Sequence, residues 1–236
     1  MNLPRRVYHL AEAANWPSIE KYGLLPASEL IARAGLNGAD RERLQRSQRP
    51  ECKVLPDGVA IRDQKPMPEA ALRACLVGLD PADWYALINA RVFFWLTPKQ
   101  LNGHRAAYAS RPQVVLTLDA AALLADYGDQ VALSAINSGY AFRKPAPRGA
   151  ATFVPYAQWV ESGWSSETAA LGTTKRPRWY SPVELTVLGA IPDVMRYVIT
   201  TARLAAGEQF EEKPPEPESD RPAPPLAPSP RLRRAP

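Results

Sequence analysis

The sequence has few of the residues that most often build metal sites. Only two cysteines, Cys52 and Cys75, and two histidines, His9 and His104, occur among the 236 residues, and their spacing is not that of zinc ligands. We therefore expect no metal. Two isolated cysteines also form no disulfide framework and are typical of a chain with reduced thiols.

Long hydrophobic runs and nucleotide-binding signatures are missing too. No apolar run approaches the 18 residues of a transmembrane helix, and the N-terminal MNLPRRVYHL lacks the apolar segment of a signal peptide. The motifs GxxxxGK[ST], GxGxxG, HExxH and GxSxG do not occur. We expect a cytoplasmic protein with no membrane partner, whose functional residues are scattered along the chain.

Proline, in contrast, is abundant, and it is concentrated at the C-terminal end. The chain has 25 prolines against 13 glycines, and nine of the prolines lie between residues 214 and 236. That stretch has few large apolar residues and no periodicity, so burial cannot offset the entropy of ordering it. We predict a domain over residues 1–207 and a disordered proline-rich tail over 208–236. The net charge of +5 does not come from the tail, because acids slightly outnumber bases there.

The pattern of the domain predicts an α+β fold. A short strand at 6–10 precedes a helix, for which Asn15 is the expected N-cap and Gly23 the end. Helices with proline at their start are expected at about 68–77 and 81–89, and buried strands at 91–97, 113–119 and 183–191. No strict alternation of strand and helix occurs. The polar stretch 161–178 has no clear period, which is typical of a functional loop.

Two polar residues interrupt strands that otherwise look apolar. His9 lies in the first strand and Glu184 in the last. A buried glutamate is costly unless it is paired or functional. Alternatively, His9 is a hydrogen-bonded core histidine and Glu184 lies on the solvent side of an edge strand, since strict alternation places Val183, Leu185 and Val187 on the other side.

The order of several blocks resembles the ADP-ribosyltransferase-like superfamily, in particular the DNA-modifying toxins of the DarT kind and the RNA 2′-phosphotransferases. The opening YHLAEAANWPSIEKYGLL resembles the family's histidine-bearing strand, its helix and its Gly-Leu turn. RVFFWLTPKQL and QVVLTLD resemble its middle strands, and SPVELTVLGAIPDVMRYVI resembles the strand with the catalytic glutamate. The resemblance covers Val7 to about Ile199 and looks closest to an uncharacterised bacterial branch. It implies a split β-sheet core with flanking helices.

The resemblance also implies roles for individual residues. Glu184 would stabilise the cationic centre that forms when nicotinamide leaves NAD, and His9 would bind a ribose hydroxyl. Either Arg46 or Arg49 would contact the pyrophosphate, and Arg49 is also a catalytic candidate. Rings that could pack on nicotinamide are those of Phe93, Phe94 and Tyr108.

Two further segments carry charge that suits an anionic ligand. Arg62 and Asp63 form either a surface turn or a buried pair that shapes the cleft. The loop 137–149 contains Arg148 and is either a cover for the ligand or a plain surface loop.

The function that the resemblance implies is NAD-dependent transfer of ADP-ribose, by a toxin or defence enzyme, to a nucleic-acid or protein acceptor. NAD would be the substrate. Two alternatives remain open on the same fold. One is an RNA 2′-phosphotransferase, and the other is a non-catalytic module that binds a nucleotide or a partner. Leu10 stands where the DarT kind has threonine, which favours the module.

Overall fold

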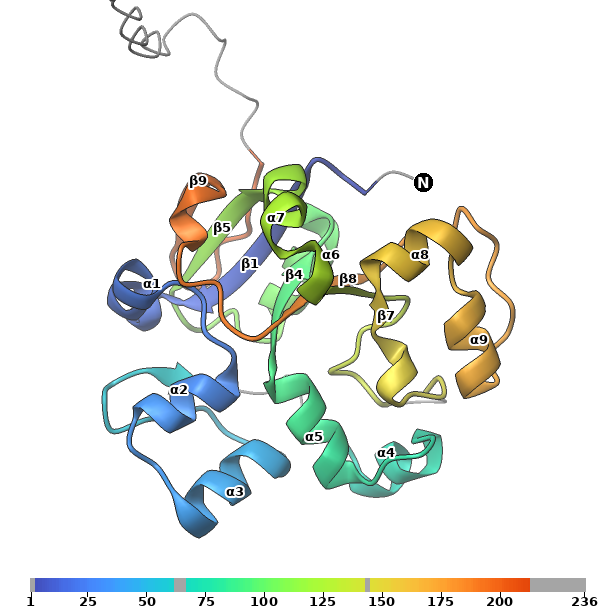
Figure 1. Ribbon diagram of the computed structural model, residues 1–236. Coiled ribbons are helices and arrows are strands. Elements are labelled where there is room, and N and C mark those ends of the chain that lie inside the picture. Colours follow the sequence, from blue (N-terminus) through green and yellow to red (C-terminus); the bar gives the residue numbers. More distant parts are fainter. Residues whose placement is uncertain (1–2, 62–66, 143–144, 213–236) are drawn as a thin grey trace, which may run out of the picture.

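Helices and strands alternate irregularly along the computed structural model, which describes residues 3–61, 67–142 and 145–212 (Figure 1). The fold is α+β, as predicted. The strands are β1 (Arg6–Glu12), β2 (Lys53–Val54), β3 (Ala60–Ile61), β4 (Arg91–Trp95), β5 (Gln113–Asp119), β6 (Val131–Ser134), β7 (Val154–Pro155), β8 (Glu184–Leu188) and β9 (Val198–Leu204). The helices are α1 (Trp16–Tyr22), α2 (Ala27–Arg33), α3 (Gly38–Arg46), α4 (Glu69–Cys75), α5 (Pro81–Asn89), α6 (Pro98–Ala106), α7 (Ala120–Tyr127), α8 (Tyr156–Ser162) and α9 (Ser165–Leu171).

The main sheet has seven strands in the order β7-β6-β8-β4-β1-β5-β9 and is split near its middle. Strands β1 and β5 are paired along seven consecutive positions, and β4 and β8 along five. Between β1 and β4, in contrast, only Tyr8 is paired with Trp95. The two halves of the sheet therefore diverge beyond that pair. This is the split sheet that the resemblance implies.

The main core lies on one face of the sheet. Alternate residues of neighbouring strands point to it, among them Val7 on β1, Phe94 on β4 and Leu185 on β8, all fully buried. The strand β5 is buried on both faces, which explains its continuous apolar run. Helices α2, α3, α4 and α5 gather at one end of the sheet, below it in Figure 1.

Local signals at helix starts are confirmed where a proline follows a capping side chain. The helix α5 begins at Pro81, and the Asp80 side chain accepts a hydrogen bond from the backbone N–H of Asp83. Pro98 begins α6 in the same way, with Thr97 as the cap. Asn15 precedes α1 as predicted, but its side chain makes no capping hydrogen bond. The side chain is hydrogen-bonded instead to the backbone of Ala60 on β3.

Gly23 ends α1 for two reasons. Its φ of 74° lies in the region that favours glycine, and a Cβ atom there would lie 2.1 Å from the carbonyl oxygen of Ile191. That close approach joins Leu24 to Ile191 by a pair of backbone hydrogen bonds. The end of the first helix is thereby fixed against the segment that follows β8.

Two expectations about the second half of the domain were wrong. The stretch 161–178 is not one irregular loop, because the end of α8 and the whole of α9 lie in it. The last strand of the domain is β9, at 198–204, and not the segment 183–191. Four of the seven residues of β9 are exposed, so this edge strand lacks the apolar run by which the buried strands are recognised.

The domain extends beyond the predicted boundary at residue 207. Phe210 is 5% exposed and packs against Tyr8, and its backbone makes two hydrogen bonds with the side chain of Asn102. Glu212 pairs with Arg6 at 2.7 Å. Residues 208–212 therefore belong to the packed domain. The rest of the predicted tail, 213–236, lies outside the described residues.

Among the residues that the structure describes, no helix is long and apolar enough to cross a membrane.

Candidate functional site

A cavity of about 260 Å³ opens where β1 and β4 diverge. Small-molecule sites in proteins have volumes of about 300–1,000 Å³, so this cavity is slightly smaller than that range. Strands β1, β4 and β8, helices α5 and α6 and the segment before α1 contribute to its wall. Its polar and aromatic lining residues include His9, Glu12, Asn15, Arg49, Arg91, Phe93, Trp95, His104, Tyr108, Ser138 and Glu184.

Glu184, the first residue of β8, is buried in the wall of this cavity with an exposed fraction of 2%. It is opposite Trp95 on one side and Ser134 on the other, so it does not lie on an edge strand. Both of its carboxylate oxygens lie 3.2 Å from the backbone nitrogen of Ser138, which donates to them. Burial raises the pKa of Glu184 to about 7, although the Ser138 N–H and the charge of Arg148 act to lower it.

Arg148, in the loop for which a ligand cover and a plain surface loop were the two alternatives, does not reach out toward solvent. Its exposed fraction is 2%, and its guanidinium donates to the carbonyl oxygens of Ser138 and Ala146. The guanidinium also lies 5.7 Å from the centre of the Trp84 ring. Arg148 therefore holds the loop against the domain, and the loop in turn holds the carboxylate of Glu184 through the Ser138 N–H.

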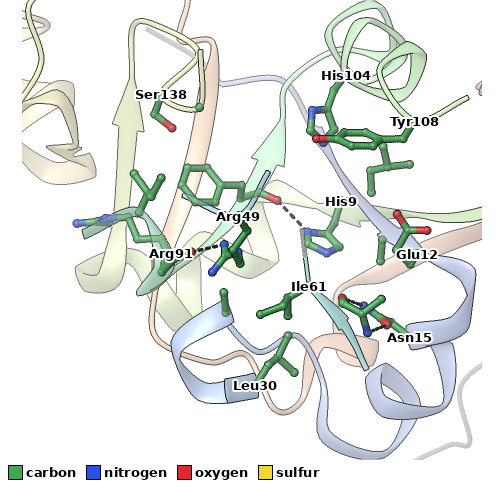
Figure 2. A pocket seen from close by; sticks show the side chains of 18 of the residues that line it. His9, Glu12, Asn15, Leu30, Arg49, Ile61, Arg91, His104, Tyr108 and Ser138 are labelled. Carbon is green, nitrogen blue, oxygen red and sulfur yellow. Dashed lines mark hydrogen bonds between the residues drawn. The ribbon is translucent and has the colours of Figure 1, made fainter. Parts of the chain in front are cut away.

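His9 lies on β1 beside the split in the sheet. Its Nδ1 is 2.9 Å from the carbonyl oxygen of Phe93 on β4. Because a carbonyl oxygen only accepts hydrogen bonds, Nδ1 carries a proton in this contact. The contact replaces ladder hydrogen bonds at the point where the strands separate, and it orients the ring at the cavity. Figure 2 shows His9 in the middle of the view, with Arg49 beside it.

The two arginines that the sequence could not distinguish are placed differently. Arg49 lines the cavity with an exposed fraction of 5%, and it donates to the carbonyl oxygen of Leu44 and to Oδ1 of Asn89, both at 2.7 Å. Arg46 is paired with Asp83 at 2.6 Å and with Glu42 at 3.0 Å. Of the two arginines, only Arg49 is among the described residues that line the cavity.

The three aromatic candidates also differ in whether they line the cavity. Phe93 lines the cavity, whereas Phe94 is fully buried in the main core on the other face of β4. Tyr108 also lines the cavity and belongs to a series of rings. His104 lies between Trp95, at 5.2 Å, and Tyr108, at 5.5 Å. These three rings form one wall of the cavity. His104 and Tyr108 are seen at the upper right of Figure 2.

Several polar residues of the wall were missed by the sequence analysis. Asn15 donates to the carbonyl oxygen of Ala60 and accepts from its N–H, both at 2.8 Å, so it joins the end of β1 to β3. Glu12 is 6% exposed and lies 3.4 Å from Arg111. Arg91 begins β4, and its position at the start of an apolar strand was the one signal available. Arg62, another candidate, lies outside the described residues.

Together these groups suit a ligand that has an anion, hydroxyl groups and a flat ring. Buried arginines attract the anion, the histidine and the carboxylate suit hydroxyls, and the aromatic wall suits the ring. In the described part of the chain, no group of three or more histidine, cysteine, aspartate or glutamate side chains could hold a metal ion.

Comparison with known proteins gives a family model and similar solved structures. A family model with the description "Family of unknown function (DUF7002)" matches residues 5–198. No curated protein matches the chain. The structure of DarTG from Thermosipho africanus in complex with ADP-ribose is similar over 84% of this chain, with 10% identity and a TM-score of 0.42. The match covers 43% of that chain, so this protein spans less than half of its length.

Proposed function

We propose that this chain, which belongs to the DUF7002 family, binds NAD in the cavity and transfers its ADP-ribosyl group to an acceptor. One observation carries the proposal. His9 and Glu184 lie on strands that are far apart in the sequence, β1 and β8, yet they line one cavity at the split of the sheet. They are the two residues for which the sequence resemblance implies contact with the NAD ribose and catalysis.

Glu184 would assist the central step, the cleavage of the bond between nicotinamide and ribose. When the bond between nicotinamide and C1′ of the ribose breaks, the bonding electrons leave with nicotinamide and positive charge develops on the sugar. An ionised carboxylate beside C1′ stabilises that charge, and in a buried site this effect is larger than in water. A nucleophilic atom of the acceptor then forms the new bond to C1′ and loses its proton. No covalent intermediate with the protein is needed.

The other lining residues would position the dinucleotide. The ring of His9, oriented by its bond to the Phe93 carbonyl, would contact a ribose hydroxyl. Phe93 and Tyr108 would pack against flat rings of the ligand, and Arg49 would contact the phosphates. The acceptor is proposed to be a nucleic acid or a protein, since the domain carries the net positive charge of the chain.

A second function, an RNA 2′-phosphotransferase, is favoured by a different observation. Both Arg49 and Arg91 are cavity arginines, and such an enzyme needs basic groups around a 2′-phosphate more than it needs a glutamate. Replacement of Glu184 separates the two functions. A Glu184→Gln variant that still removes a 2′-phosphate from RNA at the parent rate would favour the phosphotransferase.

Titration with NAD in a calorimeter, followed by chromatography to detect nicotinamide, tests the main proposal. We expect the parent to bind NAD and His9→Ala to bind it about tenfold more weakly, the loss expected for one hydrogen bond in a buried site. Arg46→Ala is the matched control, because Arg46 lies outside the cavity wall formed by the described residues, and its affinity should be unchanged. If NAD produced no heat at millimolar concentration and no nicotinamide appeared, the proposal would be wrong.

A further inference from the structure

Arg91 is a cavity residue to which the main proposal gives no role. Its Nη1 donates to the hydroxyl oxygen of Thr186 at 3.2 Å, and its guanidinium lies 4.4 Å from the centre of the Phe153 ring. The Nε atom is buried and has no hydrogen-bond partner among the described residues. Burial lowers the pKa of Arg91 to about 10, which leaves the side chain charged at neutral pH.

No carboxylate lies within 4.0 Å of this guanidinium in the part of the chain that the structure describes. Arg105 also has no carboxylate partner in the described part of the chain and an unpartnered Nε, but its other nitrogens donate to the carbonyl oxygens of Tyr108, Ala109 and Ala205. A buried charge without a counterion or a full set of acceptors is costly for the fold. An anion bound in the cavity would supply the counterion that Arg91 lacks.

The position of Arg91 relative to Glu184 follows from the pairing of β4 with β8. Trp95 is opposite Glu184, Phe93 is opposite Thr186, and Arg91 is the next residue on the same face. The guanidinium of Arg91 reaches back to Thr186, two residues from Glu184 along β8. Two residues of a strand span about 7 Å. The cation and the carboxylate are thus separated along one face by roughly the size of a sugar ring.

We propose that Arg91 binds a phosphate-type oxyanion of the ligand in this cavity. The Thr186 hydroxyl and the Phe153 ring fix the plane of the guanidinium, so its remaining N–H groups can contact phosphate oxygens with little loss of side-chain entropy. In NAD this oxyanion is the pyrophosphate, which joins the nicotinamide ribose at its 5′ oxygen. The identification of NAD rests on the proposed function, whereas the binding of an oxyanion does not.

Two variants and three probes test the proposal. Arg91→Met keeps an unbranched apolar side chain and removes the charge, and Arg91→Lys keeps the charge but loses the planar fork. Inorganic pyrophosphate, NAD and nicotinamide riboside, which has no phosphate, are titrated in a calorimeter. We expect Arg91→Met to weaken binding of pyrophosphate and NAD about tenfold or more, and to leave that of nicotinamide riboside unchanged. Arg91→Lys should lose less.

Thermal unfolding without ligand distinguishes ligand binding from a structural role. Removal of an uncompensated buried charge should leave the melting temperature of Arg91→Met unchanged or higher than that of the parent. Arg43→Met removes a charge of the same sign from the exposed face of α3 and is the control for net charge. Affinity for pyrophosphate and NAD that is unchanged in Arg91→Met would overturn the proposal, as would equal weakening of all three probes.

The failure of this inference can be distinguished from that of the proposed function. If pyrophosphate binds and depends on Arg91 but NAD does not bind, the oxyanion site stands and the NAD proposal is wrong. If NAD binds equally well to the parent and to Arg91→Met, the proposed function stands and Arg91 is not its phosphate contact.

Discussion

Two glutamates, Glu167 on α9 and Glu184 on β8, have the same exposed fraction of 2% but different surroundings. Glu167 forms an ion pair with Arg176 and accepts a hydrogen bond from the hydroxyl of Thr173. Glu184 has no adjacent cation among the described residues; Ser138 hydrogen-bonds to its carboxylate, and Glu184 lines the cavity. Burial raises the pKa of both, and the adjacent Arg176 counteracts this effect at Glu167.

The difference indicates which buried charge is structural. At Glu167 the protein itself supplies the opposite charge, that of Arg176. The ion pair holds the segment after α9 against the helix. At Glu184 the opposite charge of Arg148 acts only at a distance, and burial still raises the pKa of the carboxyl to about 7. A carboxylate in that state, next to a cavity, is suited to a ligand on which positive charge develops.

The largest effect that the comparison predicts is on stability at Glu167. Glu167→Gln should lower the free energy of unfolding by about 3 kcal/mol, since it leaves the charge of Arg176 without its partner. The value is at the low end of the usual range because Arg176 keeps an exposed fraction of 14%. Urea unfolding at pH 7 measures it. The control Glu161→Gln changes an exposed glutamate of α8 and should stay within about 0.5 kcal/mol of the parent.

At Glu184 the same substitution should affect turnover instead. Glu184→Gln can still accept a hydrogen bond from the Ser138 N–H, but it cannot stabilise positive charge on the ribose. We expect nicotinamide release to fall about 10²-fold or more, with little change in NAD affinity. Rate measurements at saturating NAD and calorimetry check the two parts. A loss of 3 kcal/mol or more in stability together with loss of binding would place Glu184 in the same class as Glu167.

Local signals in the sequence were sufficient for much of the fold. Proline after a capping residue gave α5, apolar runs gave β4 and β5, and an isolated glycine gave the end of α1. The edge strand β9 and the docking of Phe210 could not be predicted in this way. Both depend on partners that are distant in sequence, because β9 is paired with β5 and Phe210 is bound by Asn102.

The candidate site was predictable in part for the same reason. His9 and Glu184 stand out because each is polar in an apolar strand, and both line the cavity. Glu167 gives no such signal, and the position of Arg91 at the start of an apolar strand is only a weak one, because the sequence does not show which carboxylates and arginines meet. The choice between Arg46 and Arg49 likewise depends on the positions of Asp83 and Asn89, which only the folded chain shows.

The pH dependence of stability gives a smaller effect that sharpens the comparison. The folded-state pKa of Glu184 is about 7 and its ordinary value is 4.5, so between these pH values the folded state holds a proton that the unfolded state has lost. The protonated, neutral form of Glu184 is the one that the fold accommodates. Its contribution to the free energy of unfolding is therefore fully present below about pH 4.5 and is lost as the pH rises through 7. From pH 5 to 8 the parent should lose about 1–3 kcal/mol relative to Glu184→Gln. Parallel stability curves for the two proteins would contradict the raised pKa.

The smallest predicted effect is on the rate of nicotinamide release, and it tests whether the ionised form of Glu184 is the active one. Only an ionised carboxylate stabilises positive charge on the ribose, so activity should follow the fraction of Glu184 that has lost its proton. With a pKa of about 7, kcat/KM should rise about tenfold from pH 6 to pH 8 and then level off. We specify kcat/KM because it reports the protein without ligand, whereas bound pyrophosphate would raise the pKa of a nearby carboxylate. The remaining activity of Glu184→Gln should not show this rise. An activity that falls through pH 7 would mean that the protonated form is active, and that Glu184 donates a proton instead of stabilising a charge.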